Sequence, residues 1–371
     1  MKITCNREKL LSAFQTVASV APTRSPKPIL QSVKFEVTGE SAILMATDLE
    51  IGIRYDVPAV EVESAGSAVL PIQRFGSILR ESSDEKLSLE SDGSGTTIRG
   101  ERSEFRLPGQ DPQGFPVVAV FGETTYQEVS ARLFREAIRR TSFATDNESS
   151  RYALGGVLLE LESTKLVAVS TDGRRLAKME GPATAVGGEA SPESSLIVPT
   201  RAMNLLERAI SDDDGEIQIA GRASEVLVKS PRATIFARLL EGRFPRWRDV
   251  FPPREGVASV ELSVGPLLSA VRQAAIATSE ESRGVDFQFS SGTLVLTAQA
   301  ADVGQSRVEL PIAYEGREVA ITMDPRFVAD FLKVLDADKT FTIELKDSES
   351  AALLSTDDGY AYVIMPLARD R

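Results

Sequence analysis

The sequence predicts an α+β protein made of three copies of one domain, and three observations support this prediction. Strand-like runs of alternating apolar residues lead repeatedly into amphipathic helices. The same order of elements returns along the chain, so that Asp48, Asp172 and Asp302 occupy matching positions, 124 and 130 residues apart. The chain has 371 residues, of which 42% are hydrophobic, and this is enough to form several cores.

Each predicted repeat begins with a short strand and an amphipathic helix. Apolar residues recur every three or four positions in these helices, which is the spacing of a buried helix face. The three strand–helix pairs are expected at residues 2–4 with 7–19, 127–129 with 131–141, and 260–262 with 265–277.

Alternating runs then predict a hairpin, a second strand–helix step and closing strand pairs in every repeat. The hairpins are expected at 33–37 with 42–46, 156–161 with 166–170, and 285–289 with 294–298. The second strand–helix steps are expected at 69–71 with 73–80, 197–199 with 200–210, and 320–323 with 325–335. The closing strand pairs lie within 87–107, 216–239 and 341–365, so the order β-α-β-β-β occurs twice in each repeat.

Two connecting segments rich in Pro or Gly separate the repeats, at residues 110–125 and 252–256. They predict an N-terminal domain over 1–122, a central domain over 126–252 and a C-terminal domain over 256–371.

The composition excludes several kinds of catalytic and cofactor site. The chain has no histidine, which excludes Ser-His-Asp and Cys-His catalysis and imidazole zinc sites. Its single cysteine, Cys5, cannot form an internal disulfide or hold zinc through thiolates alone. No GxxxxGK[ST] loop is present, and Gly93-Ser94-Gly95 does not have the GxGxxG spacing, so no cofactor is expected. The absence of an 18-residue apolar run and of an apolar N-terminal signal predicts a cytoplasmic protein without membrane contact.

Charge is unevenly distributed between the predicted helices and the rest of the chain. The net charge is −12, yet the six predicted helices carry thirteen basic and only four acidic residues. In the helix 131–141 the spacing predicts that Arg132, Arg135, Arg139 and Arg140 face outward, opposite the apolar side. A solvated face is the usual explanation for one such helix, but six basic helices at repeating positions indicate a surface that binds phosphates. Long basic side chains without base-reading motifs predict binding of DNA that does not depend on sequence.

The chain resembles the bacterial DNA polymerase III sliding clamp family, the beta subunit, over its whole length. The similar stretches are residues 2–4 leading to 7–11, Arg24 before 28–30, 46–50, 170–177, 241–245 and 362–366. This resemblance implies three clamp-type domains in each subunit of a ring-shaped head-to-tail homodimer, with helices on the inner face and antiparallel sheets outside. It also implies a non-catalytic sliding clamp that encircles duplex DNA and makes the polymerase processive. The implied partners are double-stranded DNA, the DNA polymerase III catalytic subunit, an ATP-dependent clamp loader, and other polymerases and repair proteins that bind through short peptide motifs.

The resemblance also implies the positions of three sites. The protein-binding pocket is expected at Leu154, Thr171, Gly173, Arg174, Arg175, Leu176, Pro245, Val250, Val363 and Met365. DNA contacts are expected at Arg24, Gln73, Arg74, Arg80, Ser149, Arg151, Tyr152 and Arg201, and the subunit joint at Phe105, Leu107 and Ile276. The chain departs from the family at Arg174, where histidine is frequent, at Gln73 and Asp249, which are commonly basic, and in an extension over 368–371.

Two other functions compete with the clamp. A carboxylate–metal nuclease would use Asp48, Asp172 or the run Asp212-Asp213-Asp214, but the first two belong to different repeats. The acidic run instead indicates a polar turn after the helix 200–210, closed by Gly215. A scaffold that binds only proteins would leave the basic helices unexplained.

Overall fold

The order β-α-β-β-β occurs twice in each of three repeats, as the sequence predicts. The first repeat contains β1 (Lys2–Asn6), α1 (Arg7–Ala18), β2 (Ser32–Val37), β3 (Ala42–Thr47), β4 (Ile51–Asp56), β6 (Gly66–Pro71), α2 (Ile72–Glu81), β7 (Lys86–Ser91), β8 (Gly95–Arg99) and β9 (Glu104–Pro108). The second contains β10 (Tyr126–Ser130), α3 (Ala131–Thr141), β11 (Gly156–Leu161), β12 (Lys165–Thr171), β13 (Arg175–Pro182), β15 (Ser195–Pro199), α4 (Thr200–Ala209), β16 (Glu216–Gly221), β17 (Glu225–Lys229) and β18 (Ala233–Arg238). The third contains β19 (Ala258–Ser263), α5 (Val264–Ala274), β20 (Val285–Ser290), β21 (Thr293–Ala300), β22 (Gly304–Pro311), β23 (Val319–Met323), α6 (Pro325–Lys333), β24 (Thr340–Leu345), β25 (Ala352–Ser355) and β26 (Tyr360–Ile364).

Two short strands not expected from the sequence join the middle of the first two repeats. They are β5 (Val60–Ser64) and β14 (Thr184–Val186), and they pair with β1 and β10 respectively. The helix boundaries otherwise agree with the predicted ones to within three residues, and the predicted α+β class with antiparallel sheets is confirmed.

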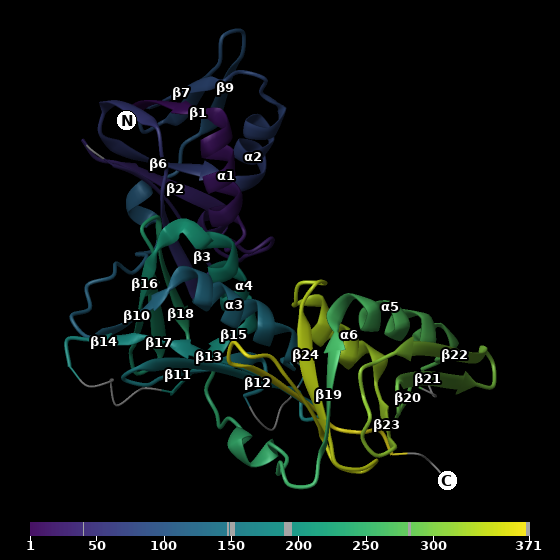
Figure 1. Cartoon of the computed structure of the whole chain (residues 1–371). Helices are drawn as coiled ribbons and strands as arrows, with labels where there is room; N and C mark the ends of the chain where they lie inside the picture. The colour runs from purple at the N-terminus through teal and green to yellow at the C-terminus, as the bar shows by residue number, and fades with distance from the viewer. Residues whose placement is uncertain (40, 147, 149–152, 189–194, 281–282, 369–371) are drawn as a thin grey trace. The chain divides into compact units, whose positions relative to one another are not determined.

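This computed structural model describes residues 1–39, 41–146, 148, 153–188, 195–280 and 283–368. The chain divides into two units, drawn in Figure 1. Unit 1 comprises Met1–Arg135, Leu161–Thr164 and Ala183–Leu239, and unit 2 comprises Glu136–Glu160, Lys165–Pro182 and Leu240–Arg371. The central repeat therefore contributes strands to both units.

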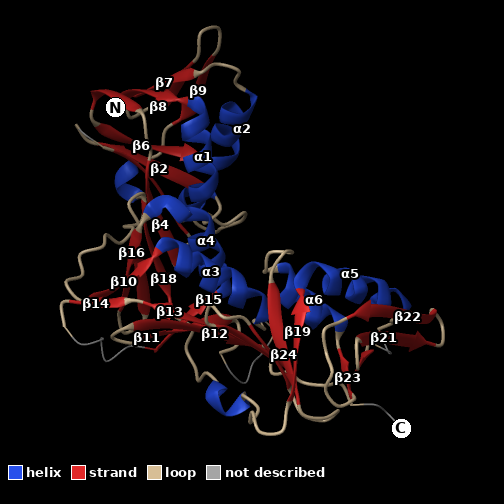
Figure 2. Ribbon diagram, in the orientation of Figure 1, coloured by secondary structure: helices blue, strands red, loops and turns tan. Residues whose placement is uncertain are grey.

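Unit 1 contains two antiparallel sheets. The first has the order β5-β1-β7-β8-β9, and the second has the order β14-β10-β16-β17-β18-β4-β3-β2-β6. Helices α1 and α2 lie side by side against these strands (Figure 2). Their close approach needs a residue without a side chain, because a Cβ atom on Gly76 would lie 2.8 Å from the ring of Phe14.

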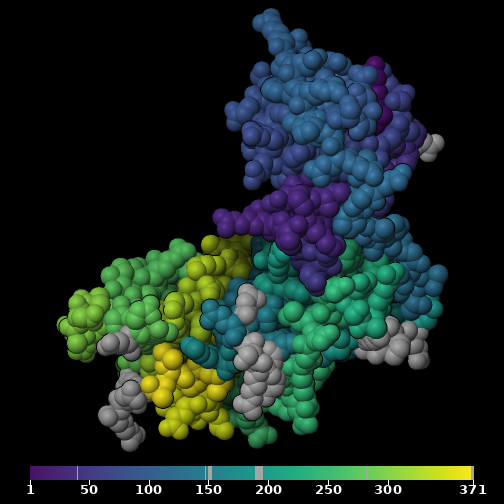
Figure 3. Space-filling view, turned by 180° about the vertical axis from the view of Figure 1, so that it is seen from behind, coloured from purple at the N-terminus to yellow at the C-terminus, as the bar shows by residue number. Residues whose placement is uncertain are grey.

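Unit 2 repeats this arrangement with the third repeat. Strands β11, β12, β13, β26, β25, β24 and β19 follow one another in one sheet, and β22-β21-β20-β23 form another. Helices α5 and α6 pack against each other, and the Asp324 carboxylate begins α6 by accepting a hydrogen bond from the Arg326 amide at 2.9 Å. In the space-filling view the green and yellow C-terminal segments form a closely packed body (Figure 3).

The largest buried side chains are aromatic and branched aliphatic residues on the strands and helix faces, as the periodic apolar pattern predicts. Among the described residues, no helix is long and apolar enough to cross a membrane.

Candidate functional site

Two turns at matching positions of the first two repeats have the same internal hydrogen bonds. In the first turn, residues 47–51, the Thr47 hydroxyl donates to the Ile51 carbonyl at 2.8 Å and accepts from the Leu49 amide at 3.0 Å. The Asp48 carboxylate accepts from the amides of Glu50 at 2.9 Å and Ile51 at 2.7 Å. Threonine and aspartate therefore fix the turn through their side chains.

In the second turn, residues 171–175, Thr171 and Asp172 make the same bonds. The Thr171 hydroxyl donates to the Arg175 carbonyl at 2.6 Å and accepts from the Gly173 amide at 3.0 Å. The Asp172 carboxylate accepts from the amides of Arg174 and Arg175 at 2.9 and 3.0 Å. Asp302 lies in the corresponding hairpin of the third repeat, but no hydrogen bond of its carboxylate is found within the described part of the chain.

Each turn leads into a strand that joins two repeats. The first turn precedes β4, which pairs with β18, so that Ile53 lies opposite Ile235. The second turn precedes β13, which pairs with β26, so that Ala177 lies opposite Tyr362. The first junction, β4 with β18, belongs to unit 1, and the second junction, β13 with β26, belongs to unit 2.

At the second junction the Arg175 side chain is enclosed rather than presented to a ligand. Its side chain is 9% exposed and pairs with Asp172 at 3.0 Å and Asp330 at 2.8 Å. It also donates to the Tyr362 hydroxyl at 3.3 Å and the Phe143 carbonyl at 2.8 Å. Burial lowers the pKa of this guanidinium, but Tyr362, Asp330 and Asp172 outweigh burial and raise the pKa above its usual value. Arg175 therefore holds the second turn to α6.

A second arginine of this junction corrects a prediction from helix geometry. Arg140 was expected on the outer face of α3, but its side chain is only 11% exposed and its guanidinium lies over the Tyr360 ring, 5.3 Å from the centroid. It pairs with Glu136 at 2.9 Å and Asp358 at 2.7 Å. The reason is angular: at 100° per residue Arg140 lies about 100° from Arg139, at the border of the apolar side.

The two aromatic rings beside these arginines stack on one side chain of α6. Phe331 lies 5.2 Å from the Tyr360 centroid and 5.4 Å from the Tyr362 centroid. Burial raises the pKa of Tyr360 and of Tyr362, so both phenols stay neutral over the physiological range.

All ten predicted pocket residues lie in unit 2. Met365 continues from β26, and its amide donates to the Arg174 carbonyl at 2.9 Å, so it lies beside the second turn. Met365 and Val250 are 44% and 39% exposed, which is unusual for apolar side chains of this size. The Leu154, Thr171, Leu176 and Val363 side chains are buried, and Gly173 and Arg174 are exposed.

The remaining pocket residues follow β18 on the connection to the third repeat. This connection lies beside β11, because the Trp247 indole and the Arg248 guanidinium both donate to the Glu160 carboxylate, at 3.2 Å for the indole. Pro245 is partly buried, and the Asp249 side chain is exposed on the same connection.

The connection between the first two repeats covers one face of the first junction. Phe115 and Val118 from this connection pack in one cluster with Phe236 of β18 and Met45 of β3. The cluster also contains Val69 and Leu227, with Ile29, Ile43, Ala119 and Phe121 packed against it.

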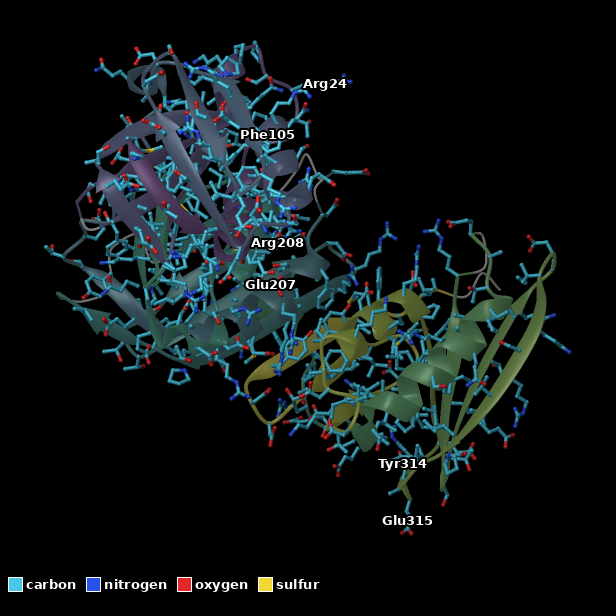
Figure 4. The ribbon with its side chains drawn as sticks, turned by 90° about the horizontal axis from the view of Figure 1, so that it is seen from above. Arg24, Phe105, Glu207, Arg208, Tyr314 and Glu315 are labelled. Atoms are coloured by element: carbon cyan, nitrogen blue, oxygen red, sulfur yellow. The ribbon has the colours of Figure 1, made fainter. Side chains whose placement is uncertain are left out.

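The predicted DNA-contacting residues that the structure describes are all exposed on unit 1. Gln73, Arg74 and Arg80 project from α2, and Arg24 lies at the surface on the loop after α1 (Figure 4). Arg201 is 56% exposed, but its guanidinium pairs with Asp48 and donates to the Val20 carbonyl at 2.7 Å. Ser149, Arg151 and Tyr152 lie outside the described residues.

The three predicted joint residues differ in exposure. Ile276 is 75% exposed in the short 3-10 helix Ala275–Ala277 that follows α5. Phe105 on β9, labelled in Figure 4, is 39% exposed. Leu107 is 7% exposed and packs within unit 1. Of these three residues, Phe105 and Ile276 are thus the ones with exposed apolar surface to bury against another molecule.

The acidic residues considered for a nuclease are used by the fold. Asp48 and Asp172 fix the two turns, and Asp214 caps a short 3-10 helix and pairs with Arg232 at 2.8 Å. Gly215 ends that turn with a φ of 71°, as the sequence predicts. Within the described ranges no group of three or more Cys, Asp or Glu side chains is placed to hold a metal ion.

Comparison with known families matches the three repeats in order. The N-terminal, central and C-terminal domain models of the DNA polymerase III beta subunit match residues 1–119, 128–246 and 248–368. The chain belongs to the DNA polymerase III beta subunit family. This family consists of sliding clamps, which are non-catalytic processivity factors, so the predicted class of protein is confirmed.

Relatives and solved structures of this family span the full chain. The beta sliding clamp of Chlamydia trachomatis is 30% identical over 368 residues, covering 99% of this chain and 87% of the relative. That of Escherichia coli K12 is 28% identical, covering 99% of this chain and 100% of the relative. The Pseudomonas aeruginosa sliding clamp structure has a TM-score of 0.87 at 28% identity and full coverage of both chains, and the Bacillus subtilis clamp has the same fold, with a TM-score of 0.89 at 22% identity.

Several residues that shape the clamp's second junction were missed from the sequence. Asp330 and Asp358 contact arginines that lie 155 and 218 residues away, and no local pattern links such partners. One signal was present, because Arg140 follows Arg139 directly and two adjacent helix residues cannot both point straight outward.

Proposed function

We propose that this chain is the sliding clamp of DNA polymerase III, a homodimer that encircles duplex DNA, moves along it without reading sequence and holds the polymerase at its template. The observation that carries this proposal is the match of all three beta-subunit domains, in order, over nearly the whole chain. Processivity then follows because a tethered polymerase rebinds in an intramolecular step at high effective concentration.

DNA is held through phosphates by the exposed basic side chains of unit 1. Arg24, Arg74 and Arg80 are the strongest candidates, because no ion pair of theirs is found within the described residues. Arg201 makes a weaker contact, since Asp48 already neutralises it. Gln73 contributes a hydrogen bond without charge, and Ser149, Arg151 and Tyr152 are further proposed contacts. Contacts of this type give affinity without sequence preference.

Polymerase and repair proteins bind at the second junction. The exposed side chains of Met365 and Val250 offer apolar surface to a short peptide, and Gly173 leaves its turn open, with no atom near the place of a Cβ. Arg174 and Asp249 add opposite charges close to this surface, so peptides with complementary charges bind more tightly. Arg175 acts by holding the turn in place.

The dimer forms head to tail, with Phe105 of one copy meeting Ile276 of the other. Leu107 lies two residues further along β9, on the same side of the strand, and belongs to this joint from within its own subunit. The proposed domains cover residues 1–122, 126–252 and 256–371. An ATP-dependent loader opens the joint, and the protein acts in the cytoplasm.

Retention on DNA of different topology tests this function. The clamp is loaded onto nicked circular DNA with a cognate loader and ATP, washed at high salt, and measured before and after the circle is cut. A closed ring stays on circles at high salt and leaves when the DNA is linearised. A protein held only by phosphate contacts leaves both forms as salt rises, and this result would reject the proposal if the loader retains a control clamp.

A further inference from the structure

Two of the strands at the edges of the described sheets hold matching places in the repeats. Within the described residues, β9 is the last strand of the order β5-β1-β7-β8-β9, and β22 is the first strand of β22-β21-β20-β23. An edge of this kind presents free backbone amides and carbonyls that pair readily with another strand.

The repeat shows which strands pair at these edges. Strand β4 is the third strand after the first helix of its repeat, and it pairs with β18, the last strand of the next repeat. Strand β13 holds the same place as β4, and it pairs with β26, again the last strand of the next repeat. Strand β22 holds this place in the third repeat, and β9 is the last strand of the first. In the proposed homodimer, on which this inference rests, β22 therefore pairs with β9 of a second copy.

The position of β9 in this pairing is given by the strand ladders. In each repeat the path starts on the first strand, at the residue four positions before the first helix. It then follows the paired residues from strand to strand until it ends at one residue of the last strand, and these end residues are equivalent in the three repeats. This path runs Ile3–Leu89–Ile98–Phe105 in the first repeat, Gln127–Ile219–Val228–Ile235 in the second, and Val260–Ile343–Leu354–Tyr362 in the third. Phe105 therefore corresponds to Ile235 and Tyr362.

The position of β22 is found in the same way, with a path that starts four residues before the second helix of the repeat and ends on the third strand after the first helix. The path runs Ala68–Phe35–Leu44–Tyr55 in the first repeat and Ile321–Phe287–Leu296–Val308 in the third. Val308 thus corresponds to Tyr55, and Ser306 corresponds to Ile53. Since Ile53 lies opposite Ile235, Ser306 lies opposite Phe105 of the second copy, and Arg307 lies opposite Glu104.

Side-chain directions agree with this register. The Ser306 hydroxyl donates to the carbonyl of Ala274, the last residue of α5, at 2.8 Å, so this side of β22 faces the end of α5, and the exposed Ile276 follows two residues later. Phe105 then lies beside Ile276, as the joint requires. Because side chains alternate along a strand, Arg307 and Glu104 point to the opposite, solvent-facing side.

The ladder extends one position further at both internal junctions. The Asp56 amide donates to the Arg232 carbonyl at 2.8 Å, and the Glu180 amide donates to the Gly359 carbonyl at 3.2 Å. The corresponding residues of the joint are Glu309 and Arg102, which again have opposite charges.

Each side of the joint carries charges already arranged in alternation. On β9 the Glu104 carboxylate pairs with Arg99 at 2.7 Å, and Arg99 pairs in turn with Glu90 at 2.9 Å. On β22 the Arg307 guanidinium pairs with Glu309 at 2.6 Å. Glu104 and Arg307 are 62% and 60% exposed, so each can accept a further partner.

We propose that Glu104 of one copy pairs with Arg307 of the second copy on the solvent-facing side of the joint, joining the two sets of charges into one alternating network. The pair favours association of chains with this charge arrangement, because like charges directly opposite each other in a ladder repel. Each dimer contains two such joints, so a reversal of one charge acts twice.

A charge-swap experiment on the full chain tests the pair. The variants Glu104→Arg and Arg307→Glu each place like charges at both joints, so each alone should have a dimer dissociation constant about tenfold or more above the wild-type value. Mixed together they form a heterodimer with opposite charges at both joints, the arginine at 104 of the first variant facing the glutamate at 307 of the second at one joint and Glu104 facing Arg307 at the other. The dissociation constant of this heterodimer should therefore lie close to the wild-type value. The double variant E104R/R307E should also dimerise normally, but it should form few mixed dimers with the wild type, as measured by native mass spectrometry.

The control variant is Glu61→Arg on β5, the opposite edge of the same sheet, where Glu61 is exposed and pairs with Lys86. It should leave dimerisation unchanged. If the double variant dimerises no better than the single variants while the wild type is a dimer, the Glu104–Arg307 pair is wrong and the homodimer stands. A wild-type chain that is monomeric at micromolar concentration by light scattering would overturn both the pair and the proposed homodimer.

Discussion

The two junctions between repeats use the same turn for different purposes. In both, a threonine hydroxyl and an aspartate carboxylate bind the same backbone groups, at Thr47 and Asp48 in the first turn and at Thr171 and Asp172 in the second. The last residue of the turn differs between them. The first turn ends with Ile51, buried in unit 1, whereas the second ends with Arg175, which ties the turn to α6.

The exposure of apolar side chains differs between the two junctions as well. At the first, Phe236 covers Gly52 so closely that a Cβ would lie 2.2 Å from its ring, and Phe115 and Val118 seal the cluster. At the second, Met365 and Val250 keep exposed apolar surface. The same repeated fold thus makes one junction that is covered and one junction that keeps exposed apolar surface for a partner.

The largest expected effect is the loss of the enclosed arginine at the second junction. Arg175→Ala leaves Asp172 and Asp330 without their buried partner, which should lower the free energy of unfolding by about 3–5 kcal/mol. The matched change at the first turn, Arg201→Ala, removes an exposed partner of Asp48 and should cost less than about 1 kcal/mol. Urea unfolding of both variants measures the difference, and equal losses would show that the junctions are not distinguished in this way.

The next effect tests the sealed face of the first junction. Gly52→Ala forces the Phe236 ring to move, and overpacking of this kind should cost about 1–3 kcal/mol of stability. Gly39→Ala is the control, since a Cβ there meets no atom within 4 Å. A shift of the thermal midpoint no larger than that of Gly39→Ala would mean that Phe236 does not press on the strand.

A binding measurement compares Met365, the residue after β26, with Arg238, the last residue of β18. Met365→Ala removes exposed apolar surface, which should raise the dissociation constant of a polymerase-tail peptide about tenfold. Arg238 holds the same place at the first junction, since Ala237 and Ile364 lie opposite Ile51 and Arg175. Arg238→Ala should leave the peptide affinity unchanged in calorimetric titration, and an unchanged affinity for Met365→Ala would reject the pocket.

A smaller effect concerns the third residue of each turn. Leu49 has a φ of 82° and Gly173 a φ of 86°, a region that costs a leucine about 1–2 kcal/mol but not a glycine. Leu49→Gly should therefore raise the free energy of unfolding by up to about 1 kcal/mol, after the entropy that glycine adds to the unfolded chain is subtracted. Gly173→Ala should lower it by about 1 kcal/mol. Changes of the same sign in both variants would contradict the common turn geometry.

The smallest effect is the pH dependence of the second junction. Burial raises the pKa of Asp358, but hydrogen bonds from Thr356 and Arg140 outweigh burial and hold it below its usual value of 3.8. A carboxylate whose pKa is lowered by folding adds stability above the unfolded value and loses it as the pH falls through the folded value. The stability difference between the wild type and Asp358→Asn should thus be constant near pH 7 and shrink below pH 3.8. A difference that grows on acidification would contradict this assignment.

Much of the fold was predictable because the repeat imposes the same local pattern three times. Apolar periodicity located the six α-helices of the described residues, and the run after α4 was correctly expected to form a turn at Gly215. Asp302 was matched to Asp48 and Asp172 by spacing, but the hairpin of the third repeat is paired over a longer stretch and its turn is built differently.

The candidate sites were less predictable because they depend on distant partners. Arg175 could be placed in the second turn from its neighbours in sequence, but its pairing with Asp330 forms only when β13 meets the third repeat. The pairing of charges between β9 and β22 can be inferred only from the strand ladders, because these fix the residues that lie opposite each other.

The most direct test of the difference between the junctions is hydrogen exchange of the clamp with and without a polymerase-tail peptide. Bound peptide should slow exchange in the second turn, residues 171–175, and at the end of β26, and leave the first turn, residues 47–51, unchanged. Protection at the first turn, or at neither turn with the peptide at saturating concentration, would contradict the assignment of the open junction as the partner-binding site.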